Sequence, residues 1–365
     1  MRSIYFDRIK RCMLDARDGK ELTIGFFGGS ITQGSLATNS SLTYAYRVFE
    51  WWKEHYPKAE FYYVNGGIGG TSSHFGTARI VKDLLMYQPD FIVVDFSVND
   101  DEKDGEFFQE TYEGVIRQIL KWPSKPAIVV LNNVFYDTGM NAQEYHNAVA
   151  DYYKIPHVSI KDTIYQRVLS GEFTCGELTP DNLHPNDKGH ELLAEEICIF
   201  LDSVRLIVEA EEKEEKAFSE VLPIPMTANA YEYARLHTIE NSSPELDGFR
   251  ADPREKMGHL DCFKNGWIAE KAGSKICFRI ECSCIAVQYR KTIQKPSPVA
   301  RVIVDGLEEE AVILDGNFDE MWGDCLYLQK VMHHGIKKIH TVNIEVIETH
   351  EDDKSPFYLL SLITA

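Results

Sequence analysis

The sequence predicts a three-layer α/β/α sandwich around a parallel sheet, followed by a C-terminal antiparallel β-sandwich. Three observations lead to this prediction. The chain has 365 residues, more than one hydrophobic core usually holds, so two domains are expected. Up to about residue 205, short apolar strand patterns alternate with amphipathic helices, an order typical of parallel sheets. Beyond about residue 225, strand patterns follow one another without helices between them.

The first domain, residues 1–205, contains four strand patterns. Several of them are nearly continuous apolar runs, as expected for parallel strands covered on both faces: Leu22–Phe27, Glu60–Val64, Phe91–Phe96 and Ala127–Leu131. Helical patterns fill the gaps and carry apolar residues at helical spacing. These stripes are Ala45, Val48, Phe49 and Trp52; Ile80, Leu84 and Leu85; and Val115, Ile116, Ile119 and Leu120. A last helix is predicted after Pro185, with Leu192, Leu193, Ile197 and Phe200 facing inward.

Residues 206–225 are predicted to be an acidic linker. Glu209–Glu220 reads EAEEKEEKAFSE, which indicates a solvated helix or an extended connection, and Pro223 and Pro225 end any helix. The second domain, residues 226–365, contains short strand patterns separated by turn residues. They are Lys275–Ile280, Ile285–Arg290, Arg301–Asp305, Ala311–Leu314, Thr341–Ile347 and Tyr358–Ile363. This spacing favours an antiparallel β-sandwich.

Charge and composition exclude several classes of partner. The net charge of −19 argues against nucleic acid and anionic membranes as binding partners. An acidic protein surface cannot displace the counterions that surround either of them, so binding gains nothing from counterion release. The sequence has neither an apolar run long enough to span a membrane nor a secretory signal, so we expect a cytoplasmic protein. Eight cysteines without a CxxC pair are expected to be reduced thiols. We expect no cofactor and no metal; homo-oligomerisation is left open.

A serine flanked by glycines follows the first predicted strand, in the run Gly28-Gly29-Ser30-Ile31-Thr32. A nucleophilic serine requires an exposed hydroxyl on a tight turn at a strand end, and glycines permit the strained backbone of such a turn. Two alternatives are a glycine turn with an incidental serine and a phosphate-binding loop. The second is the weaker one, because neither the lysine of a P-loop nor a GxGxxG run is present.

Three further polar segments follow strands or close the first domain. The second strand leads into the glycine-rich run 65–70, whose backbone N–H groups can point into a cleft. The third strand leads into Ser97-Val98-Asn99-Asp100, where the asparagine could equally be a turn former. Near the end of the domain, Asp181 precedes His184 by three residues. On a loop, that spacing lets the carboxylate reach one ring nitrogen and leaves the other facing the cleft.

Together these four segments resemble the four sequence blocks of SGNH hydrolases, also called GDSL esterases, over residues 20–205. The resemblance implies a flavodoxin-like fold with Ser30 as nucleophile, His184 as general base and Asp181 as the residue that orients the imidazole. It also implies an oxyanion hole made of the Ser30 N–H, the Gly70 N–H and the Asn99 amide. Gly69 is the alternative to Gly70.

Two positions depart from the family pattern. Gly29 occupies the place where many members have aspartate, and Ser97 stands where glycine is common. The GGSIT form of the serine block resembles a branch rich in carbohydrate esterases. Asp95 is a charge within an apolar strand and needs a partner if it is buried. We hypothesise that Asp95 anchors the Ser30 loop in place of the missing aspartate.

The whole chain resembles two-domain carbohydrate acetylesterases in which a jelly-roll-like β-sandwich follows the SGNH domain. This resemblance implies removal of O-acetyl groups from mannan- or xylan-derived oligosaccharides through an acyl-serine, with the β-sandwich binding sugar or covering the active site. Trp267 and Trp322 are the candidates for sugar contact, although tryptophans in β-sandwiches are more often core residues. The alternatives are a short-chain lipase or thioesterase of the same fold, and a non-catalytic carbohydrate-binding protein.

Overall fold

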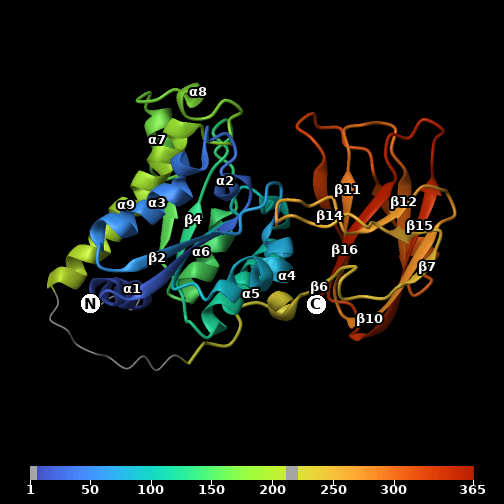
Figure 1. The fold of residues 1–365 in the computed structure, drawn as a ribbon, viewed down its shortest axis with the longest axis horizontal. Coiled ribbons are helices and arrows are strands. Elements are labelled where there is room, and N and C mark those ends of the chain that lie inside the picture. The colour runs from blue at the N-terminus through green and yellow to red at the C-terminus, as the bar shows by residue number, and fades with distance from the viewer. Residues whose placement is uncertain (1–5, 211–220) are drawn as a thin grey trace. The chain divides into compact units, whose positions relative to one another are not determined.

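The computed structural model describes residues 6–210 and 221–365, which form two compact units, Met1–Glu232 and Tyr233–Ala365 (Figure 1). The first unit is built on a parallel sheet of five strands in the order β2-β1-β3-β4-β5. The strands are β1 (Glu21–Gly28), β2 (Glu60–Asn65), β3 (Phe91–Asp95), β4 (Ala127–Asn132) and β5 (His157–Ser159). The four predicted strands are confirmed. The sequence analysis missed β5, because three residues are too few for a hydrophobic pattern.

Helices cover both faces of this sheet, so the predicted α/β/α sandwich is confirmed (Figure 1). One face packs against α1 (Asp7–Arg17), α3 (Tyr44–His55) and α9 (Asp187–Ala210). The other packs against α4 (Ser73–Asp83), α5 (Gly105–Lys121) and α6 (Gln143–Tyr152). The predicted apolar stripes lie in these two cores; only Phe200 is partly exposed, against the ring of Phe6. The shorter helices are α2 (Ser30–Gln33), α7 (Ile164–Leu169) and α8 (Cys175–Leu178).

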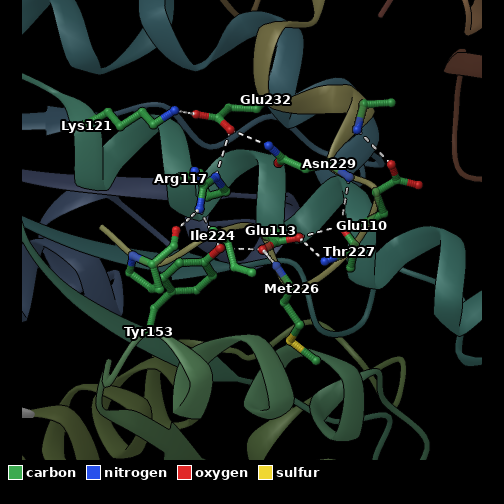
Figure 2. Close-up of polar contacts among 12 residues, drawn as sticks. Glu110, Glu113, Arg117, Lys121, Tyr153, Ile224, Met226, Thr227, Asn229 and Glu232 are labelled. Atoms are coloured by element: carbon green, nitrogen blue, oxygen red, sulfur yellow. Dashed lines mark hydrogen bonds and ion pairs between the residues drawn. The ribbon is translucent and has the colours of Figure 1, made fainter. Parts of the chain in front are cut away.

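A segment after the acidic stretch, residues 223–232, packs back onto α5 (Figure 2). Glu113 of α5 accepts hydrogen bonds from the backbone N–H groups of Met226, at 2.6 Å, and Thr227, at 2.8 Å. Glu113 is fully buried, and charge-assisted bonds to backbone N–H groups compensate for its loss of hydration. We call residues 223–232 the strap.

Arg117, one turn further along α5, holds the two ends of the strap (Figure 2). Its guanidinium donates to the Pro223 carbonyl at 2.9 Å and pairs with Glu232 at 2.7 Å. These contacts place residues 226–232 in the first unit, whereas the sequence assigned them to the second domain. Helix α9 likewise continues past residue 205 to Ala210, and half of the predicted acidic linker, residues 211–220, lies outside the described residues.

The second unit consists of two antiparallel sheets. One has the order β13-β12-β15-β10-β7; the other has the order β14-β11-β16-β9-β8, with β6 also paired to β16. The strands are β6 (Arg235–His237), β7 (Glu245–Asp247), β8 (Arg250–Ala251), β9 (Trp267–Ala269), β10 (Lys275–Cys282), β11 (Ile285–Lys291), β12 (Val299–Val304), β13 (Val312–Asp315), β14 (Cys325–Met332), β15 (Lys338–Glu348) and β16 (Phe357–Thr364). One core combines residues of both sheets, so the predicted β-sandwich is confirmed. The sequence analysis missed β14 and the short strands β6–β9.

The two tryptophans proposed for sugar contact lie in different environments. Trp267 is 2% exposed and packs edge-on against Phe278 inside the core of the sandwich. No sugar ring can reach its face, which corrects the expectation that it contacts substrate. Trp322 is 58% exposed and contacts the ring of Phe318. Among the described residues, none of the helices combines the length and the apolar character that crossing a bilayer demands.

Candidate active site

Ser30 is the first residue of α2, directly after the turn that ends β1. Gly29 makes this turn, and Asn99, which follows β3, packs against its Cα. A Cβ at position 29 would lie 2.0 Å from the Asn99 side-chain oxygen, so a larger residue here would displace the Asn99 amide from its present position.

The Asp181–His184 loop is shaped by the aspartate itself. One carboxylate oxygen of Asp181 accepts hydrogen bonds from the N–H groups of Leu183 and His184 and from the hydroxyl of Thr179. Asn182, between them, adopts a left-handed conformation with φ +65°. A short polar side chain stabilises a tight turn of this kind by accepting hydrogen bonds from backbone N–H groups a few residues further along the chain.

Ser30, His184 and Asp181 form a chain of hydrogen bonds. His184 Nε2 lies 2.8 Å from Ser30 Oγ, and His184 Nδ1 lies 2.7 Å from the second carboxylate oxygen of Asp181. An ionised carboxylate only accepts hydrogen bonds, so Nδ1 carries the proton and Nε2 of the neutral imidazole accepts one from the serine hydroxyl. The structure therefore brings together the three residues that the sequence assigned to one site.

The environment of Asp181 keeps it ionised. Its partial burial favours the neutral acid, but the hydrogen bonds from the His184 side chain and from the His184 and Leu183 backbone outweigh that effect. The pKa of Asp181 is therefore lowered from its ordinary value. An ionised Asp181 can stabilise the positive charge that His184 takes on when it accepts a proton.

The glycine-rich segment after β2 approaches Ser30 at Gly69, where an added Cβ would lie 3.6 Å from the Ser30 Cβ. The N–H of Gly69 already donates a hydrogen bond to the Gln33 side-chain oxygen, at 2.6 Å. Gly70 has a left-handed φ of +67°, and within residues 6–210 and 221–365 no acceptor pairs with its N–H. Of the two glycines that the sequence left open, Gly70 is therefore the one whose N–H remains available for the predicted role of oxyanion donor.

Asp95 lies behind the Ser30 helix and is fully buried. Its carboxylate accepts hydrogen bonds from Asn133 Nδ2, at 2.9 Å, and from Thr32 Oγ1, at 3.2 Å, while its carbonyl accepts the Gly29 N–H. Thr32 is two residues after Ser30 and also contacts the Tyr44 hydroxyl. Asp95 thus contacts the serine segment on both sides of the nucleophile position, as the anchoring hypothesis requires.

Burial raises the pKa of Asp95 from 3.8 to about 7. The folded protein therefore binds this proton more tightly than the unfolded chain, and the Asp95 contribution to stability declines as pH rises from about 4 to 7. At 1.36 kcal/mol per pKa unit, the decline amounts to about 4 kcal/mol. We expect Asp95→Asn to remove this decline, so that the variant matches the wild type near pH 4 and exceeds it at pH 8 in denaturant unfolding. Parallel pH profiles for the two proteins would contradict this expectation.

Two buried residues that support the site, His190 and Asp100, were not predicted from the sequence. His190 of α9 accepts the Tyr44 N–H through Nδ1 and contacts the Ser35 carbonyl through Nε2. Its burial lowers its pKa to about 4, so it is neutral and links the chain after α2 to the helix after His184. Asp100 similarly accepts the Ser73 N–H and contacts His146. No local pattern marks His190, because its partners Tyr44 and Ser35 lie 146 and 155 positions away in the sequence.

Comparison with known proteins identifies the family. Residues 26–192 match the GDSL-like Lipase/Acylhydrolase family. A two-domain esterase (CEX) active on acetylated mannans is 47% identical, with a TM-score of 0.94 over 98% of this chain and 95% of that one. A crystal of the two-domain esterase with mannopentaose gives 46% identity and a TM-score of 0.92 over 98% and 94% of the two chains. A search of curated proteins gave no match. The chain belongs to the GDSL-like lipase/acylhydrolase family and is a carboxylic ester hydrolase.

Proposed function

We propose that the protein is a serine esterase that removes O-acetyl groups from mannan-derived oligosaccharides. The observation that carries this proposal is the hydrogen-bond chain from Ser30 Oγ through His184 to Asp181. A hydroxyl that donates to a neutral imidazole, which is itself oriented by a carboxylate, is an activated nucleophile.

In the proposed reaction, Ser30 Oγ attacks the acetyl carbonyl while its proton passes to His184 Nε2. The oxygen of the tetrahedral intermediate is bound by the N–H groups of Ser30 and Gly70 and by the Asn99 amide. His184 then gives the proton to the departing sugar oxygen, which leaves an acetyl ester on Ser30. Water, activated by the same imidazole, attacks this ester and releases acetate.

The substrate class is supported by the relatives that span almost the whole chain, which are described as active on acetylated mannans. We propose mannan-derived rather than xylan-derived oligosaccharides on that basis. The exposed ring of Trp322 provides an aromatic face on which a sugar can stack. All eight cysteines are free thiols, which supports a reducing, cytoplasmic location and imported oligosaccharides as substrates.

The proposal is tested by incubating the protein with acetylated manno- and xylo-oligosaccharides and following acetyl loss by mass spectrometry. We expect deacetylation of the manno-oligosaccharides at a higher kcat/KM than of the xylo-oligosaccharides. An activated long-chain acyl ester is a third substrate, and a preference for it would show a lipase instead. Binding of the sugars without acetyl loss would contradict the proposed activity.

Replacement of Asn99 by alanine is expected to lower kcat by about 100- to 1,000-fold, because one preorganised donor to the oxyanion is lost. KM should change little, since the amide acts on charge that develops in the transition state. The matched control is Asn99→Asp, which keeps the side-chain shape against Gly29 but loses the donors. Normal turnover by either variant, measured by initial rates with an aryl acetate, would remove Asn99 from the oxyanion hole.

A further inference from the structure

We propose that Arg79 is a positioning residue that sets the distance between the nucleophile and the oxyanion hole. Arg79 belongs to α4 and is 2% exposed, although it carries a full charge. A buried guanidinium is costly unless it is paired and hydrogen-bonded. The groups that pair with the Arg79 guanidinium therefore indicate which parts of the fold it holds in place. The inference deepens the proposed function and rests on it.

One edge of the guanidinium binds the backbone of the serine turn. Arg79 Nη2 donates to the carbonyl oxygen of Gly28 at 2.9 Å, two residues before Ser30. The same carbonyl also accepts the N–H of Ile68 at 3.1 Å, so it joins the serine turn to the glycine-rich segment. The Arg79 guanidinium carbon lies 4.3 Å from the ring centroid of Phe27, which fixes its plane.

The same side chain binds the glycine-rich segment near both of its ends. Arg79 Nη1 donates to the Gly66 carbonyl at 2.5 Å, and Nη2 lies 3.4 Å from Thr71 Oγ1. Gly66 begins the segment and Thr71 directly follows Gly70, the proposed oxyanion donor. Asp83, one turn along α4, holds Nη1 at 3.0 Å and neutralises its charge.

A single rigid group therefore spans two loops that contribute different parts of the reaction. Ser30 supplies the attacking oxygen, and Gly70 supplies an N–H that must meet the developing oxyanion at hydrogen-bond distance. The planar fork of arginine donates in two fixed directions at once, which the single ammonium of lysine cannot reproduce. Without that fork, the two loops can separate, and a displacement of about 1 Å at such a site can cost about 100-fold in rate.

The test is Arg79→Lys, compared with Arg117→Lys as the matched control. Arg117 is also buried and paired, but it holds the strap and contributes nothing to the Ser30 site. We expect Arg79→Lys to lower kcat by about 100-fold with KM changed less than about threefold, and to slow labelling of Ser30 by a serine-reactive phosphonate. Arg117→Lys should lower the melting temperature of the protein but keep kcat within about twofold of wild type.

A second readout separates positioning from stability. Low millimolar guanidinium, added to Arg79→Ala, should restore part of kcat, whereas the activity of a merely destabilised protein would not change at this low concentration. If the Arg79 variants do not fold, Asp83→Ala, which removes the side-chain acceptor of Nη1, takes their place and should lower kcat severalfold. The inference is overturned if the tested variant keeps kcat within about twofold of wild type or loses no more than Arg117→Lys. A wild type that the phosphonate does not label would instead overturn the proposed function.

Discussion

Replacing Ser30 with alanine is expected to lower kcat for acetyl-ester hydrolysis by about 10⁴- to 10⁶-fold. The acyl-serine cannot form without the hydroxyl, and the N–H donors that remain give only a small residual rate. Folding should be unaffected, because Ser30 is the first residue of a short helix and its side chain bonds only to His184 among the described residues. Initial rates with an aryl acetate and with acetylated manno-oligosaccharides measure the loss, and phosphonate labelling should disappear with it.

Ser35 provides the matched control for this substitution. It lies one turn beyond Ser30, and among the described residues its contacts are made through the backbone, including the carbonyl that faces His190. Ser35→Ala should therefore keep kcat within about twofold of wild type. Substantial turnover by Ser30→Ala would mean that another group attacks the ester, and the proposed acyl-serine mechanism would fail.

The main strands and the candidate catalytic segments could be predicted because each has a local signal. The buried parallel strands are apolar runs, and Ser30, Asn99 and His184 follow strands or precede a helix in an order that the family repeats. The left-handed residues Gly70 and Asn182 are a glycine and an asparagine, the types that adopt this conformation with least strain.

The supporting interactions could not be predicted, because they depend on which distant segments meet. Nothing near Arg79 in the sequence reveals that its guanidinium binds carbonyls at positions 28 and 66. The strap is similar: Glu113 bonds to residues more than a hundred positions away, so residues 223–225 were assigned to the linker and residues 226–232 to the second domain. Trp267 was ambiguous for the same reason, since a strand pattern does not tell which face meets the opposite sheet.

Asp181→Asn is expected to lower kcat by about 10⁴-fold at neutral pH, although it preserves the shape of the side chain. The reason lies in how the two carboxylate oxygens are used. One accepts three donors, from Thr179, Leu183 and the His184 backbone, so the amide oxygen of the variant must take that place. The NH₂ group then faces His184 Nδ1 and donates to it. His184 is forced into the tautomer that carries its proton on Nε2, where it cannot accept the proton of Ser30.

Asp187→Asn is the matched control, because Asp187 begins the helix after His184 and its carboxylate binds Thr38 rather than the catalytic residues. That variant should keep kcat within about twofold. Asp181→Asn should melt near the wild-type temperature, since most of its loop contacts persist, and phosphonate labelling of Ser30 should slow in step with kcat. If Asp181→Asn instead turned over at the wild-type rate, the carboxylate would serve only to shape the loop, and His184 would be oriented by another group.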